Sequence, residues 1–573
     1  MHGPQTAHQT LAAALRPLFL SMLVSVLHIQ SGISESIAQT TVVSPASQSS
    51  HWSHINISDF GRALPFQGDA SVRSNAYSWF NQHVDLAEVT GNAADLRSTN
   101  PTMRLFIYQL DLSTFANTDS ANLPEEYFLH FSEDTEMQFR AFDGSTVATV
   151  TITGCPSSQP VNRNCRVQAY IWTDRRYVFN LKSATFQDWK ATQLLNSTGR
   201  SINGVFLDEH GPGFVTALAW GGQSIVVSGG AIRELNGLRP GTYGDTLDQD
   251  YNTSMVAWLT YLRTRFQQAG KFIVLNPASN MLDPMVIDQI RALQGVSTEF
   301  MHRPDAWAGA YQYQQFIDVV KEVSSNGGTV QLAGNWCYTG PSGYTNGTYG
   351  SSQARYRMWR LASYYILKES VGSSGMVHFD LALCSNATVQ PLTDSSEWLQ
   401  AYQVDVGQPV GDSYVHQQGT AGIASSDGRP CSYKIFGRTY TNALILVRPK
   451  DMWDCIDYGN GGAAAVTLPQ PGYVLREDGS LSAQTTTVSL RNAEAVIVYG
   501  IQTAPSSIPS TPSVTTVNVP TQSVTTPPTS LSTPTIPSTP PSSMRSSPTK
   551  PSTEKSQDSG LLGKLKSLMQ RVK

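Results

Sequence analysis

The sequence predicts an α/β protein in which a (β/α)8 barrel, similar to a TIM barrel, is followed by an antiparallel β-sandwich. Between residues 100 and 385, eight short β-rich runs alternate with longer segments of helical character. Several runs are apolar on both faces, as strands must be when helices cover one side and a barrel interior the other. After residue 412 the pattern becomes period-two strands separated by Gly, Asp and Pro, which is typical of an antiparallel domain.

The eight runs expected to form the barrel strands are 104–110, 126–131, 169–174, 204–209, 272–277, 296–301, 330–336 and 376–381. A segment at 176–183 competes for the position of the third strand. Helices are expected at 186–195, 255–270 and 313–325. An open doubly wound sheet is the alternative architecture, but no Gly-rich phosphate loop follows any run.

Composition and pattern divide the 573 residues into six parts. These are a signal peptide (1–38), an N-terminal segment (39–95), the barrel (96–410), the β-sandwich (411–501), a Ser/Thr/Pro-rich disordered stalk (502–558) and a basic amphipathic helix (559–573). The terminal helix is expected to associate with a membrane surface or cell wall, and a solvated tail is the alternative.

The N-terminus predicts export. An apolar run at 11–29 is interrupted only by Arg16 and Pro17, and the small-x-small site Ser36-Ile37-Ala38 follows it. This pattern is typical of a cleaved signal peptide, and an uncleaved anchor is the alternative. The protein is therefore expected to be secreted or held at the cell surface.

The cysteines and the sequons agree with export. Six cysteines fall into three neighbouring couples, namely Cys155 with Cys165, Cys337 with Cys384, and Cys431 with Cys455. An even number in an exported chain favours disulfides, although sequence leaves the pairing open. Five Asn-x-Ser/Thr sequons, at Asn56, Asn196, Asn252, Asn346 and Asn386, predict a glycoprotein in a eukaryotic host.

Charge and composition narrow the partner. The formal net charge is −4, only 14% of residues are charged, and no basic stripe accompanies a nucleic-acid motif. Nucleic acid is therefore not a predicted partner. A neutral, hydroxyl-rich carbohydrate fits this composition better. No spacing of His, Cys or carboxylate residues indicates a metal site, and no cofactor is predicted.

Polar residues stand at the ends of almost all the predicted strands, where (β/α)8 enzymes build their sites. They are Asp111, His130, Glu133, Trp172, Asp174, Asp208, Glu209, His210, Asn276, Glu299, His302, Asn335, Trp336, His378 and Asp380. Because the carboxyl ends of parallel strands meet at one face, these groups are expected to converge there.

The adjacent carboxylates Asp208 and Glu209 are the most informative pair. A buried carboxylate is costly to leave unpaired, so two in succession suggest function more than stability. Cleavage of a glycosidic bond needs two carboxyl groups, one on each side of the scissile bond. We assign Asp208 as nucleophile or base and Glu299 as proton donor, with Glu209 competing for either role. Capping of a following helix is the structural alternative for these carboxylates.

Five further residues are predicted to bind substrate. Trp172 and Trp336 would stack on sugar faces, with packing in the core as the alternative. Asn276, His302 and Asp380 would form hydrogen bonds with hydroxyl groups. A turn at His302 and a loop oriented by Asp380 are the structural alternatives.

Four stretches carry a family resemblance: "GVFLDEHG", "FIVLNP", "GVSTEF" and the block at 434–500. Over about residues 100–500 the chain resembles the glycoside-hydrolase-like barrel families that carry a C-terminal β-domain. These are distantly similar to α-galactosidase-type and polygalactosaminidase-type barrels. The resemblance implies a carboxylate nucleophile after the fourth strand and an acid/base after a later one, often the sixth. Asp208 and Glu299 match those positions.

The leading hypothesis is an exported glycoside hydrolase that cleaves a polysaccharide or glycoconjugate without a cofactor. The alternative is a catalytically inactive glycan-binding surface module. Two carboxyl groups within about 5–10 Å of each other in an open cleft would favour the hydrolase. Carboxylates that both form salt bridges with arginines would favour the binding module.

Overall fold

The computed structural model describes the parts of the chain from which the folded unit is built. They are residues 55–59, 78, 82–89, 93–141, 146–155, 162–171, 174–214, 223–228, 230–239, 244–277, 281–298, 302, 310–333, 353–380, 399–423, 428, 430–450 and 462–501. The predicted signal peptide, the Ser/Thr/Pro-rich stalk and the terminal helix lie outside these residues.

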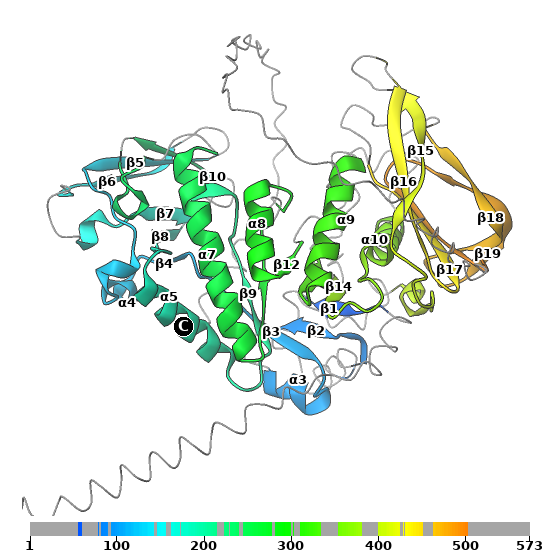
Figure 1. Ribbon diagram of the computed structural model, residues 1–573, viewed down its shortest axis with the longest axis horizontal. Helices are drawn as coiled ribbons and strands as arrows, with labels where there is room; N and C mark the ends of the chain where they lie inside the picture. Colours follow the sequence, from blue (N-terminus) through cyan, green and yellow to red (C-terminus); the bar gives the residue numbers. More distant parts are fainter. Residues whose placement is uncertain are drawn as a thin grey trace, which may run out of the picture. The chain divides into compact units, whose positions relative to one another are not determined.

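Eight parallel strands close into a barrel, which confirms the predicted fold class (Figure 1). In sequence order they are β1 (Ile57–Asp59), β2 (Leu86–Glu88), β3 (Arg104–Gln109), β9 (Gly204–Leu207), β11 (Phe272–Leu275), β12 (Gly295–Ser297), β13 (Thr329–Leu332) and β14 (Met376–Asp380). Each strand pairs with the next, and β1 pairs with β14 to close the barrel. Asp208 therefore follows the fourth strand.

The last five barrel strands lie where the sequence predicts them, and the run at 104–110 is also a barrel strand, but the predicted second and third strands are wrong. The run at 104–110 is the third strand, and the first two strands lie within the range 39–95. Strands β1 and β2 have three residues each, which is too short for a periodic signal. The runs at 126–131, 169–174 and 176–183 belong to another part of the fold.

Those runs lie in an inserted module, defined as the described residues 110–183 together with β10. It contains two three-stranded antiparallel sheets. The first consists of β4 (Ser113–Phe115), β8 (Asp174–Val178) and β7 (Gln168–Ile171), and the second of β10 (Gln223–Ser228), β5 (Thr135–Ala141) and β6 (Thr146–Ile152). The range 126–131 holds a 3-10 turn (Glu125–Tyr127) and isolated bridges at Phe128, His130 and Phe131.

The barrel strands are covered by helices α5 (Ala184–Thr198), α7 (Thr246–Gln268), α8 (Pro284–Leu293), α9 (Ala310–Ser325) and α10 (Gln353–Leu367). The short helices α3 (Ala93–Thr99) and α4 (Thr118–Ala121) complete the described set. Asp245 and Asp283 cap α7 and α8 by accepting backbone N–H groups, and Pro284 stands at the first helical position. Helices α7, α8, α9 and α10 contact one another in turn around the barrel (Figure 1). No described helix is both long and apolar enough to cross a membrane.

The barrel interior is apolar on one side and polar on the other. Leu86, Phe106, Phe206 and Val274, from β2, β3, β9 and β11, form an apolar cluster of their own. On the remaining strands, Ser297 pairs with Gln331 and Gln331 with His378, so that three polar residues share one row. Their strand neighbours Val296, Val330, Leu332, Val377 and Phe379 belong instead to the main core. The polar row therefore faces the barrel interior.

The predicted antiparallel β-domain is confirmed, and its six strands form one sheet. In spatial order they are β15 (Tyr414–Ile423), β16 (Pro430–Thr439), β17 (Ala443–Arg448), β20 (Glu494–Tyr499), β18 (Ala464–Leu475) and β19 (Leu481–Leu490). Side chains from five of these strands meet in one cluster, so the sheet curls around its own core. All six residues of β17 are buried. Ile445 and Val447 join the barrel's core, whereas Leu444 and Leu446 join the core of the β-domain.

A buried arginine joins the β-domain to the barrel. Arg438 on β16 is fully buried, and its guanidinium donates to carbonyl oxygens at the end of α10. Its Nη1 donates to Tyr365 O at 3.2 Å and also to Lys368 O, and its Nη2 donates to Glu369 O at 2.9 Å. These carbonyls have no partner within the helix, and a cation suits the negative end of the helix dipole.

The described residues include three of the predicted disulfide cysteines and three of the predicted glycosylation sequons. Cys155 and Cys165 form a disulfide, as the predicted couple requires, and Cys431 is bonded to a cysteine outside the described residues. The sequons at Asn56 and Asn252 are buried, at 0% and 8% exposure, whereas Asn196 is exposed on α5. A glycan on Asn56 would not fit this barrel, because its side chain donates to Val377 O inside the wall.

We predict that Arg438→Met will lower the free energy of unfolding by about 3 kcal/mol, because several buried carbonyl groups lose their donor. Urea denaturation measures the change. Arg476→Met is the matched control, since Arg476 is exposed on the same domain and the loss should stay below about 0.5 kcal/mol. Equal effects of the two substitutions would contradict a joining role for Arg438.

Candidate active site

Asp208 lies one residue beyond β9, at the carboxyl end of the barrel, and both of its carboxylate oxygens accept hydrogen bonds. Tyr108 on β3 donates its hydroxyl to Oδ2 at 2.5 Å, and Asn276 after β11 donates its amide to Oδ1 at 2.6 Å. Three neighbouring strands thus contribute to one cluster. Asp208 is partly exposed while Asn276 is buried, so the carboxylate remains accessible in a fixed orientation.

The alternation of β3 explains why Tyr108 reaches this cluster. Arg104, Phe106 and Tyr108 occupy every second position, and Phe106 and Tyr108 both lie near Phe206 inside the barrel. Burial and the negative charges of Asp208 and Glu209 raise the pKa of Tyr108 well above its usual value. The phenol therefore stays protonated at neutral pH and remains a hydrogen-bond donor to Asp208.

Glu209 turns away from Asp208 and forms an ion pair with Arg176 of the inserted module. Its backbone φ is 66°, a left-handed conformation that costs a non-glycine residue about 1 kcal/mol. The side chain is 7% exposed and that of Arg176 is fully buried. Burial raises the pKa of Glu209 to about 7; the charge of Arg176 opposes this shift, and that of Asp208 adds to it.

His210, the residue after Glu209, contacts a partner of its own, Asp111. Its Nε2 lies 2.8 Å from Asp111 Oδ1, and Trp258 Nε1 donates to Asp111 Oδ2 at 2.8 Å. Although burial raises the pKa of Asp111, its charge interaction with His210 and the hydrogen bonds from His210 and Trp258 outweigh burial and lower this pKa below its usual value. Asp111 is therefore a buried, ionised anchor for both His210 and α7.

The Gly-Pro-Gly break after His210 has a packing explanation. Asp248 on α7 is fully buried, and its carboxylate accepts the backbone N–H groups of Phe214 at 2.6 Å and Gly244 at 2.8 Å. A Cβ on Gly213 would lie within 2.5 Å of this carboxylate, and Gly213 has a φ of 73°. Glycine is thus required where the loop meets α7.

Of the predicted site residues, the structure brings together Asp208, Asn276 and, facing away, Glu209. Asp380 is buried at the end of β14, on the opposite side of the barrel, and accepts a hydrogen bond from Ser58 Oγ at 3.3 Å. Glu299, Trp172 and Trp336 lie outside the described residues.

His302 does not join the cluster around Asp208. It is fully buried against Trp359 and Phe379, and its Nδ1 lies 3.2 Å from Leu332 O. Phe379 belongs to the core outside the barrel and Trp359 to α10, so His302 lies between the barrel wall and that helix. Burial lowers its pKa well below the usual value, and Arg360 lowers it further. These contacts place His302 in the packed core behind the barrel wall.

Sequence analysis missed Tyr108 and Arg176. Tyr108 could have been found from its position in the alternating row Arg104, Phe106, Tyr108, one residue before the strand ends. Arg176 gave no local signal, because it lies on β8 of the inserted module and meets Glu209 only in three dimensions.

No three His, Cys, Asp or Glu side chains within the described ranges gather closely enough to hold a metal ion.

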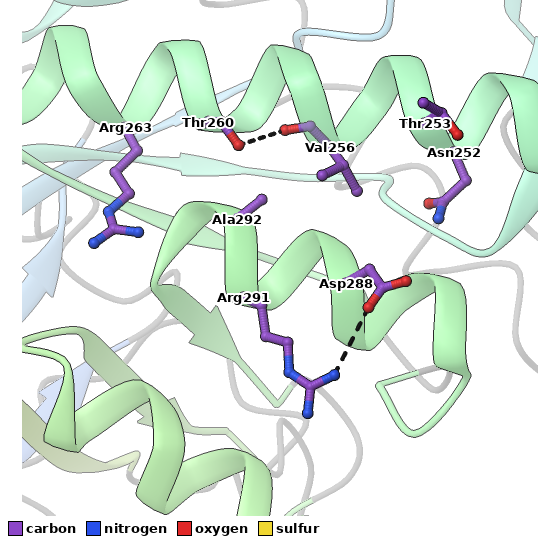
Figure 2. Close-up of a pocket in the computed structure, with 8 residues that line it drawn as sticks. All are labelled: Asn252, Thr253, Val256, Thr260, Arg263, Asp288, Arg291 and Ala292. Carbon is purple, nitrogen blue, oxygen red and sulfur yellow. Dashed lines mark hydrogen bonds and ion pairs between the residues drawn. The ribbon is translucent and has the colours of Figure 1, made fainter. Parts of the chain in front are cut away.

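A surface pocket lies between α7 and α8, lined by Asn252, Arg263, Asp288 and Arg291 among others (Figure 2). Asp288 and Arg291 form an ion pair across one turn of α8, at 3.7 Å. The pocket contains none of the predicted site residues, so the candidate site remains the group around Asp208.

Comparison with known proteins gives distant structural neighbours only. No family model matches the chain, and no curated protein matches it. Three solved structures with TM-scores of 0.40 are a noncanonic maltogenic α-amylase from Thermotoga neapolitana (8% identity), an isomaltulose synthase from Klebsiella sp. LX3 (10%) and a trehalose-6-phosphate hydrolase from Bacillus licheniformis (9%). Each alignment covers 78% of this chain, and 98%, 98% and 99% of the respective neighbour. With likeness this remote, function has to be argued from the chain's own residues.

The raised pKa of Glu209 predicts a pH-dependent stability. The folded state holds the proton up to about pH 7, whereas the unfolded chain releases it near 4.5. The wild-type free energy of unfolding should therefore fall by about 3 kcal/mol from this group between those pH values. Glu209→Gln removes this titrating carboxyl group. The free energy of unfolding of the variant, relative to wild type, should therefore rise by that amount from pH 4.5 to pH 8. Urea denaturation at both pH values tests this. Exposed Glu477→Gln is the control, and a constant difference for Glu209→Gln would contradict the raised pKa.

Proposed function

We propose that the chain is an exported glycoside hydrolase that cleaves O-glycosidic bonds of a polysaccharide or glycoconjugate with two carboxyl groups. One observation carries the proposal. A partly exposed carboxylate, Asp208, stands at the carboxyl end of the fourth barrel strand, with both oxygens fixed by Tyr108 and Asn276. That end of a (β/α)8 barrel is where such enzymes place their chemistry.

In this proposal Asp208 attacks the anomeric carbon or activates the water that does so. A carboxylate held by two donors loses little freedom when it meets substrate, and such orientation lowers the barrier of the reaction. Tyr108 and Asn276 act as positioning residues because they touch Asp208 and not the reacting atoms.

Glu299 is the proposed proton donor. It follows β12, the sixth barrel strand, by two residues in the sequence, which is the position that the family resemblance implies for the acid/base. A carboxyl group at the barrel mouth, close to the charge of Asp208, would hold its proton more tightly, as an acid catalyst must. Glu209 is the weaker choice for this role because Arg176 occupies its carboxylate.

The alternative of an inactive glycan-binding module is favoured by one contact, the ion pair of Glu209 with Arg176. Asp208 does not share this feature, since its two partners are the uncharged side chains of Tyr108 and Asn276. The hydrolase therefore fits the pair of carboxylates better than the module does.

Export and surface attachment complete the proposal. The apolar run at 11–29 would direct secretion, the stretch at 502–558 would form an extended stalk, and the basic helix at 559–573 would contact a membrane or cell wall. These elements would hold the barrel outside the cell, where polysaccharides and glycoconjugates are available.

Hydrolysis of a glycan library by the full chain tests the proposal. Asp208→Asn and Glu299→Gln should each lower the rate on any cleaved glycan by several orders of magnitude, with unchanged circular dichroism. Asp95→Asn, on the exposed face of α3, is the matched control and should keep full activity. A wild-type rate in either active-site variant removes that residue from the mechanism, and a library left uncleaved by the wild type supports the binding module.

Tyr108→Phe separates positioning from binding. Loss of one donor to Asp208 should lower kcat about 10- to 100-fold and leave KM nearly unchanged, because the substrate itself is not touched. Steady-state kinetics on the best library glycan measures both constants. A rise in KM at constant kcat would place Tyr108 in substrate binding instead.

A further inference from the structure

Arg176 carries two buried N–H groups that no oxygen of the described chain accepts. Its Nη1 donates to Glu209, whereas Nε and Nη2 have no hydrogen-bond partner. These two nitrogens share one edge of the planar guanidinium, the edge that presents two parallel donors. The whole side chain is buried.

Two unmet donors on a buried cation are a substantial cost, on the order of 1–3 kcal/mol for each group. Native proteins satisfy more than about 90% of buried polar groups, so each exception calls for an explanation, such as a bound water or ion or a functional role. The Nε and Nη2 groups of Arg176, called the fork below, thus form a fixed pair of donors. Their acceptors have to come from outside the described chain.

The position of Arg176 relates this fork to the candidate active site. It lies on β8 directly opposite Phe115 of β4, and its guanidinium is 4.8 Å from the centre of the Phe115 ring. Phe115 is 37% exposed, so this aromatic side chain reaches solvent beside the buried fork. On its other side Arg176 meets Glu209, the neighbour of Asp208, and its charge acts on Tyr108.

The charges around Arg176 decide the class of ligand. Glu209 already pairs with this guanidinium and the charge of Asp208 acts on Glu209, so the carboxylate of an acidic sugar would enter beside existing negative charge. Repulsion between these negative charges would disfavour the binding of an acidic sugar. A pair of neighbouring hydroxyl oxygens accepts two parallel donors without adding charge.

We propose that Arg176 binds the sugar beside Asp208, where its Nε–Nη2 edge donates to two adjacent hydroxyl oxygens of a neutral sugar and Phe115 packs against the apolar face of the ring. The inserted module then forms one wall of the substrate site and selects neutral over uronic-acid sugars. This inference rests on the proposed function for its ligand class, but it concerns binding rather than turnover.

Calorimetric titration of the full chain carrying Glu299→Gln tests the inference without turnover and keeps the charge of Asp208. The probes are neutral hexasaccharides of glucose, galactose, mannose and xylose, and a galacturonic acid hexasaccharide. Arg176→Lys keeps the charge beside Glu209 but loses the fork, and should weaken the tightest neutral probe about 10- to 100-fold. The matched control is Arg175→Lys, because Arg175 is the exposed neighbour and its guanidinium donates to Gln168. This substitution should leave the affinity unchanged.

Phe115→Leu keeps the test decisive if Arg176→Lys fails to fold, since a partly exposed ring can be replaced without emptying the core; affinity should fall several-fold. Unchanged affinity in whichever folded variant is measured overturns the inference, as does failure of every probe to bind. If the galacturonic acid probe binds more tightly than every neutral probe, and this binding depends on Arg176, the proposed preference for neutral sugars is overturned. Binding that depends on Arg176 in a chain with no hydrolytic activity would retain the inference and reject only the hydrolase.

Discussion

The turn of the backbone at Glu209 is the constraint on which the candidate site depends. A regular strand would continue the alternation of Asp208 and Glu209 across the barrel wall. Instead Glu209 adopts a left-handed conformation, and each of three consecutive polar side chains meets different partners. Asp208 accepts from Tyr108 and Asn276, Glu209 pairs with Arg176, and His210 meets Asp111. The strain at one residue is offset by hydrogen bonds that burial makes costly to lose.

The inserted module is part of the site as much as the barrel is. Arg176 is supplied by β8 and Asp111 by the segment that leads from β3 into β4, so both partners of the segment after Asp208 belong to residues 110–183. Removal of either anchor would leave a buried charge without its partner. The module therefore holds Glu209 and His210, the two residues that follow Asp208, whereas Tyr108 and Asn276 of the barrel hold Asp208 itself.

The β-domain is tied to the same core from the other side. Strand β17 faces two cores at once, and Arg438 closes the end of α10, the helix that precedes β14. Two residues of β17, Ile445 and Val447, pack into the core that surrounds the barrel. Because apolar burial and buried hydrogen bonds both cross this junction, barrel and β-domain form one folded unit rather than two linked ones.

Sequence by itself determined the fold class, the last five barrel strands, the antiparallel β-domain and the convergence of Asp208 and Asn276 at the ends of neighbouring strands. These features come from local patterns: apolar runs of strand length, period-two alternation, and polar residues that end a buried strand. Only the tertiary structure decided that β1 and β2 complete the barrel, that Tyr108 and Arg176 flank the two carboxylates, and that His302 packs behind the wall. Three-residue strands have no period to read, and contacts such as Arg176 with Glu209 join residues of separate elements. Which polar group meets which is settled by how the strands pair and pack, and that information is not local to any stretch of the chain.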